Sequence, residues 1–161
     1  MKKLIIIRHA KSSWDAPLKD IDRPLDHRGI KDAHLVASHC LNDIPKKFQM
    51  FSSSAKRATE TAIIFAQNFS YPIENITFKE ELYTFDENKL ERIIKSFPNN
   101  CDNVILFGHN EAITNFVNKF GDVFIDNVAT AGFVSIQFES ETWTNILSGK
   151  TLKTVFPKDL K

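Results

Sequence analysis

Apolar and polar positions follow two different periods along this chain, and the two alternate from end to end. An unbroken apolar run predicts a strand from Lys3 to Arg8 that is buried on both faces, as strands of a parallel sheet are. Shorter runs predict strands at Phe48–Ser52, Ile76–Lys79 and Val104–Phe107. Because segments with helical spacing separate these runs, the sequence predicts a three-layer α/β/α fold with a mainly parallel central sheet.

The first two helices are predicted from capping residues and apolar stripes. Asp26 can cap a helix from about His27 to Leu41. The stripe of this helix consists of Ile30, Ala33, Val36, Ala37 and Leu41. Ser53 or Ser54 can cap a second helix, whose small residues suit close packing on a sheet. These small-face residues are Ala55, Ala58, Thr59, Ala62, Ile63 and Ala66.

The second half of the chain continues the alternation. Apolar spacing over residues 90–97 predicts a helix that Pro98 stops, and residues 112–120 predict another that ends near Gly121. Two apolar runs, Phe133–Glu139 and Thr142–Leu147, flank a polar turn. They predict a closing antiparallel hairpin.

Composition narrows the class of protein. With 161 residues, 42% of them hydrophobic, residues 1–161 are expected to form a single domain with one core. The net charge of +1, with scattered basic residues, argues against nucleic-acid binding. No apolar stretch approaches the roughly 18 residues of a membrane span, so we expect a cytoplasmic protein without a membrane partner. Cys40 and Cys101 are isolated and are expected to be reduced and structural.

Polar side chains follow two of the predicted strands at their carboxyl ends. Arg8 and His9 end the first strand, and His109 follows Val104–Phe107 after one glycine. Arg57 falls in the first turn of the helix that follows another strand. Since ligands of open α/β sheets bind at the carboxyl ends of the strands, we expect these four side chains to converge there.

Two arginines and two histidines at one edge suit a phosphoryl group. Guanidinium groups match its oxygens, a helix N-terminus adds backbone N–H donors, and an unprotonated imidazole is a nucleophile near neutral pH. This chemistry requires no metal and no cofactor. His27, His34 and His39 are expected to be surface or half-buried residues rather than metal ligands, because His34 and His39 lie five positions apart.

Three motifs in this chain resemble those of the histidine phosphatase superfamily, which has the phosphoglycerate mutase-like fold. They are Arg8-His9-Ala10, the segment from Ser54 to Ala62 with the pattern Ser-x-x-Arg-Ala-x-x-Thr-Ala, and Gly108-His109-Asn110. Further segments resemble the compact SixA-type phosphohistidine phosphatases. These segments are Arg8–Trp14, Asp22–Leu25 with Arg28-Gly29, and Ile125–Asn127 followed by Thr130 and Gly132. The likeness covers about residues 3–147 in the correct order.

The resemblance implies a role for each motif residue. His9 would accept the phosphoryl group, while Arg8, Arg57 and His109 would bind it. His109 would also stabilise charge in the transition state. Asn110 would either donate to the phosphate or fix its loop.

Several carboxylates lie in or near the motifs, and each has more than one possible role. Larger members of the superfamily supply a glutamate as general acid, and Glu81 is the candidate here. A leaving nitrogen needs less help from a fixed acid than an alkoxide does. A site without a clear general acid therefore fits a phosphohistidine substrate better than a phosphate ester. Asp20 and Asp22 could orient the bases or donate a proton, but loop ion pairs are the more ordinary role. Glu111 suits a helix N-terminus, yet it would weaken anion binding if it pointed inward.

The loop from Ser12 to Pro24 is expected to form the rim of the site. Lys11, Arg23 and Arg28 could line the pocket mouth or lie in solvent, and Trp14 could contact a protein substrate or anchor the loop.

The leading hypothesis is therefore a phosphatase that acts on a phosphohistidine-containing protein. A phosphomonoesterase for a small sugar or nucleotide phosphate is the alternative enzyme. A phosphate-binding module with weak catalysis is the alternative outside the enzymes. No oligomeric state is predicted.

Overall fold

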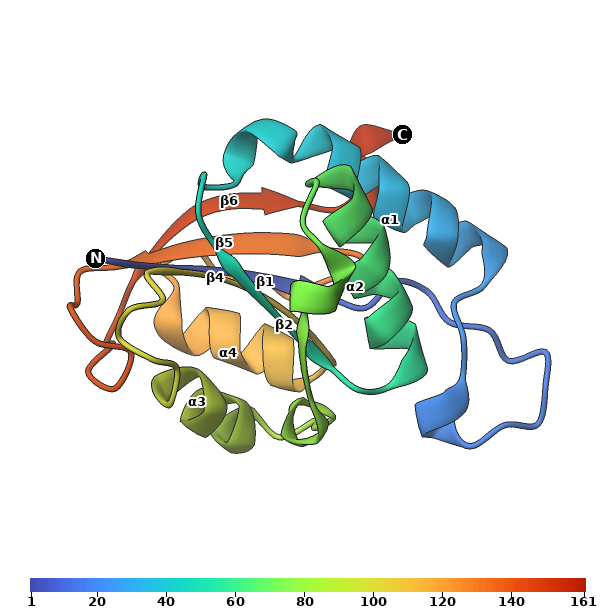
Figure 1. The fold of residues 1–161 in the computed structure, drawn as a ribbon, viewed down its shortest axis with the longest axis horizontal. Helices are drawn as coiled ribbons and strands as arrows, with labels where there is room; N and C mark the ends of the chain where they lie inside the picture. The colour runs from blue at the N-terminus through green and yellow to red at the C-terminus, as the bar shows by residue number, and fades with distance from the viewer.

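A single six-stranded sheet forms the centre of the computed structural model, which describes residues 1–161, and its strand order is β3-β2-β4-β1-β5-β6 (Figure 1). The strands are β1 (Lys2–Arg8), β2 (Gln49–Ser53), β3 (Thr77–Lys79), β4 (Asn103–Gly108), β5 (Phe133–Phe138) and β6 (Lys150–Val155). Neighbours among β1 to β4 pair in parallel, and β5 runs antiparallel to β1 and β6. The predicted α/β fold with a mainly parallel sheet is confirmed.

Helices cover both faces of this sheet. They are α1 (His27–His39), α2 (Lys56–Asn68), α3 (Glu87–Lys95) and α4 (Ala112–Phe120). Short 3-10 turns are η1 (Asp20–Asp22), η2 (Leu41–Asp43), η3 (Ile73–Asn75), η4 (Glu80–Leu82) and η5 (Pro157–Leu160). α1 packs against α2 and α3 against α4, on opposite faces (Figure 1).

The first strand shows why three layers form. Alternate side chains of β1 point to opposite faces. Leu4 and Ile6 therefore enter the core beneath α3 and α4, while Ile5 and Ile7 enter the core beneath α1 and α2. An uninterrupted apolar run is what a strand buried on both sides requires.

The predicted cap of α1 is confirmed, but part of its predicted stripe is wrong. Asp26 Oδ1 accepts a hydrogen bond from the Gly29 N–H at 2.7 Å. Ile30 and Leu41 are 42% and 47% exposed. The helix instead turns Gly29 inward, where an added Cβ would lie 2.1 Å from the carbonyl oxygen of Lys11. This close approach rotates the buried face away from Ile30.

Neither serine caps α2 as predicted. Its N-cap is Ala55, which makes no side-chain cap. Ser53 belongs to the end of β2, and its hydroxyl accepts a hydrogen bond from the Ala55 N–H at 3.1 Å. The same hydroxyl contacts His109, so this serine is part of the site described below.

Only the first strand of the predicted closing hairpin is confirmed. The first predicted strand is β5, but its antiparallel partner is β6 at Lys150–Val155, not Thr142–Leu147. That segment carries Trp143 into the core, where it is fully buried and its Nε1–H donates to the Cys101 carbonyl at 2.6 Å. Burial of a large aromatic ring outweighs strand pairing there.

The two cysteines form no disulfide, as the sequence predicts. Cys40 and Cys101 are free and buried, and burial raises the pKa of the Cys40 thiol to about 12. No helix of this structure combines the length and apolar character that a membrane span needs.

Candidate active site

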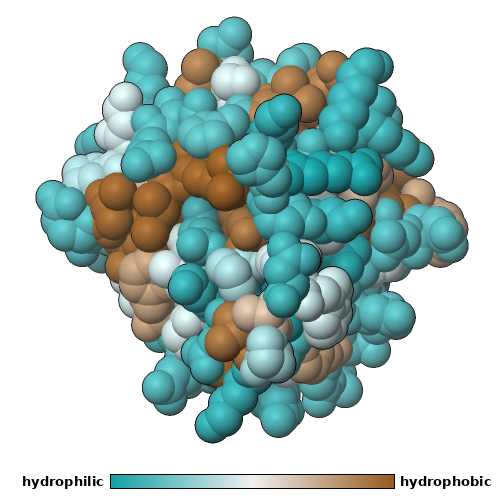
Figure 2. Space-filling view, turned by 90° about the vertical axis from the view of Figure 1, so that its right-hand side faces the viewer, coloured by the Kyte–Doolittle hydropathy of each residue, from teal (hydrophilic) through white to brown (hydrophobic).

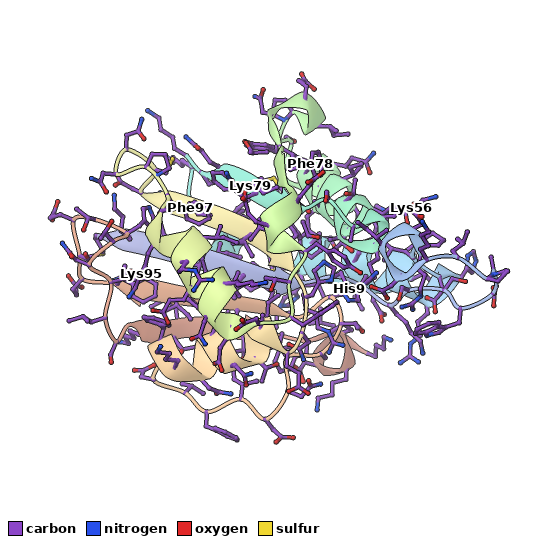
Figure 3. The ribbon with its side chains drawn as sticks, turned by 90° about the horizontal axis from the view of Figure 1, so that it is seen from below. His9, Lys56, Phe78, Lys79, Lys95 and Phe97 are labelled. Carbon is purple, nitrogen blue, oxygen red and sulfur yellow. The ribbon has the colours of Figure 1, made fainter.

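Three parallel strands bring the predicted side chains to one edge of the sheet. Arg8 pairs in register with Gly108, so His9 and His109 follow adjacent strand ends. The backbone N–H of His9 donates to the Gly108 carbonyl at 3.0 Å, and the two imidazole rings lie 5.2 Å apart between centroids. β2 pairs with the other side of β4 and leads into α2, whose second residue is Arg57. Figure 3 shows His9 at this end of the sheet.

The His9 imidazole is buried and holds a defined tautomer. Nδ1 lies 2.7 Å from the Ala10 carbonyl oxygen, and because a carbonyl can only accept, Nδ1 carries the ring proton. Nε2 keeps its lone pair and faces Arg57, whose Nε lies 3.4 Å away. Burial lowers the pKa of His9 to about 4, against the bond to Ala10 and together with the charges of Arg57 and Arg8. The ring is therefore neutral near pH 7.

His109 holds its proton on the opposite side. Its Nε2 lies 2.8 Å from Ser53 Oγ. That oxygen accepts the Ala55 N–H and still has both a hydrogen to donate and a second lone pair. When Ser53 donates its hydrogen to Nε2, the proton of His109 lies on Nδ1, a buried atom with no partner that can donate to a bound anion. Burial lowers the pKa of His109 to about 3, helped by His9 and Arg57, so it serves as a neutral donor.

One nitrogen of the Arg8 guanidinium is hydrogen-bonded, and another has no partner. Nη1 donates to the Val128 carbonyl at 2.9 Å, while Nε is buried without a partner. Burial lowers the pKa of the Arg8 guanidinium, and the carboxylate of Glu111 opposes this shift. Glu111 therefore supports the positive charge of Arg8. With His109 Nδ1, the site holds two buried donors that lack an acceptor, as expected where an anion binds.

The guanidinium group of Arg57 is bound by Asp20. Arg57 Nη2 donates to Asp20 Oδ2 at 2.8 Å, and Nη1 donates to the Asp20 carbonyl at 2.6 Å. The Tyr83 hydroxyl and Arg23 Nη1 also donate to this carboxylate. Burial alone would raise the pKa of Asp20, but the hydrogen bonds from Tyr83 and Arg57 outweigh it and lower the pKa to about 2. The expected loop ion pair of Asp20 is confirmed.

Some of these side chains border a small pocket of about 270 Å³ at a mainly hydrophilic face of the molecule, whereas His109 and Asp20 lie outside its lining (Figure 2). Its lining includes Arg8, His9 and Arg57, with exposed Lys11 at the mouth. The loop predicted as the rim does border it. The Arg23 guanidinium lies 3.1 Å above the Trp14 ring, which is 77% exposed and lines the pocket, so both roles expected for this tryptophan stay open.

Three predicted residues lie elsewhere. Glu81 is exposed and pairs with Lys79 at 3.8 Å, because η4 buries Leu82 and turns its neighbour outward. Asn110 donates to Asn127 at 2.8 Å, and its Oδ1 accepts from Thr114, so it fixes its loop. Arg28 contacts Asp32 at 3.9 Å and does not line the pocket.

Sequence reasoning missed two residues that position this site. Ser53 fixes His109, and Thr61 links the His9 loop to α2: its hydroxyl accepts from the Ala10 N–H at 2.9 Å and donates to the Arg57 carbonyl at 2.7 Å. A signal for Thr61 existed, since it is the threonine of the Ser-x-x-Arg-Ala-x-x-Thr-Ala segment and lies four residues after Arg57. Ser53 had none beyond its place at a strand end.

Solved structures with the same fold include phosphatases of two kinds. The protein histidine phosphatase SixA complexed with tungstate superposes with a TM-score of 0.82 over 99% of both chains, at 20% identity. A mycobacterial glucosyl-3-phosphoglycerate phosphatase superposes with a TM-score of 0.66, covering 94% of this chain and 97% of that one, at 12% identity. At such identities the likeness concerns the fold.

Sequence comparison is more specific about the family. An uncharacterised chloroplastic protein of Arabidopsis thaliana is 32% identical over 121 residues, which make up 68% of this chain and 55% of that protein. The matches to curated relatives span between 29% and 66% of their lengths. The model of the histidine phosphatase superfamily (branch 1) matches residues 4–100, more than half of the chain. This chain therefore belongs to the histidine phosphatase superfamily.

Proposed function

We propose that residues 1–161 act as a metal-independent phosphatase in which His9 carries the phosphoryl group. The observation that supports this most directly is the neutral, buried imidazole with its Nε2 lone pair facing Arg57. In the first step Nε2 attacks phosphorus and the bond to the leaving group breaks, and that group takes up a proton from solvent. In the second step water attacks phosphorus and gives up a proton to solvent, the bond to Nε2 breaks, and inorganic phosphate leaves.

The surrounding donors suit the charge that develops on the phosphoryl oxygens. Arg8 and Arg57 offer guanidinium groups, and His109 offers its Nδ1–H. Such fixed donors stabilise a transition state without rearranging during the reaction. Lys11, at the mouth, adds a positive charge for an approaching anion. We propose no substrate contact for Asn110, whose side chain is engaged within its loop.

Phosphohistidine on a protein is the substrate that this site supports best. Neither Asp20 nor Glu81 is placed as a general acid, because Asp20 has a pKa of about 2 and Glu81 lies outside the pocket. A leaving imidazole accepts a proton more readily than an alkoxide, so it depends less on such an acid. The fold likeness to the protein histidine phosphatase SixA is consistent with this choice.

A small phosphate ester is the second candidate. Glucosyl-3-phosphoglycerate phosphatase has the same fold, and a relative from Gloeothece citriformis, 42% identical over 67 residues, is named a 2,3-bisphosphoglycerate-dependent phosphoglycerate mutase. The third possibility, a phosphate-binding module, would bind a phosphopeptide tightly and release no phosphate. The same experiment separates all three.

The test compares a phosphohistidine peptide, phosphoramidate and a set of sugar and nucleotide phosphates as substrates. We expect the N-phosphoryl compounds to be hydrolysed fastest, with a labelled phosphoryl-enzyme trapped by alkaline quench. His9→Ala should abolish both turnover and labelling, whereas His34→Ala, at an exposed histidine on α1, should change neither. Full activity in His9→Ala would refute the mechanism, and preference for esters would replace the proposed substrate.

A further inference from the structure

A second cavity, of about 550 Å³, lies between η4 and α3 next to the candidate active site. Three cationic side chains and one carboxylate line it: Lys79 from the end of β3, Lys89 and Arg92 from α3, and Glu81 from η4, so positive charge predominates. Ile93 adds an apolar surface. We call this cavity the Lys79–Arg92 pocket. Figure 3 shows Lys79 and α3 together on the side of the molecule that faces the viewer.

The positive charge of this pocket is largely unpaired. Lys89 and Arg92 have no carboxylate within 4.0 Å, and Lys79 has only the exposed Glu81 at 3.8 Å. Glu91, on the same helix, is bound instead to Lys95 and Lys119 at 3.0 and 2.7 Å. Because the net charge of the whole chain is only +1, the excess of positive charge at this pocket is a local feature.

Helix geometry explains why the cations share one face. Residues three and four positions apart lie one above the other on a helix. Lys89, Arg92, Ile93 and Ser96 follow this spacing and line the pocket together. The helix thus offers two cations one turn apart, about 5 Å along its axis.

A single aromatic ring separates this pocket from the proposed phosphoryl site. Tyr83 lines the pocket, and its ring meets the edge of the His109 ring at 5.2 Å between centroids. The Tyr83 hydroxyl donates to Asp20, and the Arg57 guanidinium carbon lies 5.9 Å from the tyrosine ring. A group beside the phosphorylated residue of a substrate would therefore reach the cations.

We propose that the Lys79–Arg92 pocket binds acidic side chains that flank the phosphohistidine of the substrate protein. This inference rests on the proposed function and names a feature of its substrate. A segment of chain fits better than one small second anion, because the cations come from the end of β3 and from successive turns of α3. Carboxylates on neighbouring residues can meet several of them at once.

The test uses two phosphohistidine peptides that differ only in flanking residues, Asp and Glu in one and Asn and Gln in the other. Phosphoramidate, which has no flank, is the reference substrate. We expect Lys89→Glu and Arg92→Glu each to raise KM for the acidic peptide roughly fivefold, with the double variant reaching tens of fold. The neutral peptide and phosphoramidate should change less than about twofold, and 0.5 M NaCl should reduce the difference between the peptides.

Lys31→Glu is the matched control, because it makes the same charge change at an exposed position on α1, across the sheet. An equal effect on both peptides, an equal effect of Lys31→Glu, or no effect of the α3 variants would each overturn the inference. Failure to hydrolyse any N-phosphoryl compound would refute the proposed function instead. Fluorescence anisotropy with the unphosphorylated acidic peptide tests the pocket in that case, since wild type and Lys31→Glu should bind it and the α3 variants should not.

Discussion

The imidazole of His9 should stay uncharged far below the pH at which an ordinary histidine takes up a proton. Burial lowers its pKa from 6.5 to about 4. At pH 5.5 a pKa of 6.5 would leave about 9% of the rings neutral, whereas a pKa of about 4 leaves about 97% neutral. Capture of a phosphoryl group from phosphoramidate should therefore slow by less than twofold between pH 7.5 and 5.5, instead of about tenfold.

Two measurements check this value. An NMR titration from pH 3 to 8 should place the midpoints of His9 and His109 well below 6.5, with His9→Gln and His109→Gln giving the assignments. Single-turnover labelling should give the flat rate profile. A His9 midpoint near 6.5, or a tenfold loss of labelling rate at pH 5.5, would refute the claim that burial holds the nucleophile neutral.

The lowered pKa of His9 also makes the free energy of unfolding depend on pH. Because the folded pKa of His9 lies below its unfolded value, the unfolded chain binds the additional proton as the pH falls. The contribution is complete above about pH 6.5 and is lost as the pH falls towards 4, up to roughly 3 kcal/mol for His9. Urea unfolding of wild type and His9→Gln at pH 7.5 and 4.5 measures it, and equal pH dependence of the two would contradict it.

Three further substitutions test single contacts of the site. Ser53→Ala should lower kcat about five- to tenfold with folding intact, because His109 loses the partner that fixes its tautomer; unchanged kcat would remove Ser53 from the site. Asp20→Asn should tighten tungstate binding about fivefold in calorimetry, because the carboxylate no longer competes for Arg57, and weaker binding would mean that Asp20 mainly positions the arginine. Glu81→Gln should leave kcat for N-phosphoryl and ester substrates within about twofold of wild type, and a large loss on esters alone would restore Glu81 as an acid.

Local signals were sufficient for the elements that carry the site. An unbroken apolar run can only be a doubly buried strand or a buried helix segment, and its length made Lys3–Arg8 a strand. Arg8, His9 and His109 were predicted to converge because parallel strands share the direction in which they end. Asp26 was recognisable as a cap from its position before the stripe of α1.

Contacts between distant segments could not be read from local patterns. Asp20 meets Arg57 across 37 positions, and Ser53 meets His109 across 56. The ion-pairing role of Asp20 was foreseen, but its partner was not. Trp143 likewise lies in a run that was predicted as a strand. Its burial depends on packing in the core and on the hydrogen bond to the Cys101 carbonyl. Such outcomes depend on packing between elements, which periodicity does not encode.

The carboxylate of Asp20 also bears on which anions can enter at all. An incoming ligand must replace a singly charged group that already holds Arg57 at 2.8 Å and takes two further hydrogen bonds. A phosphodiester or a halide brings one charge and gains little by the exchange, whereas a terminal phosphoryl group brings close to two charges and three acceptor oxygens. We therefore expect Asp20 to favour the binding of monoesters and phosphoramidates over that of diesters.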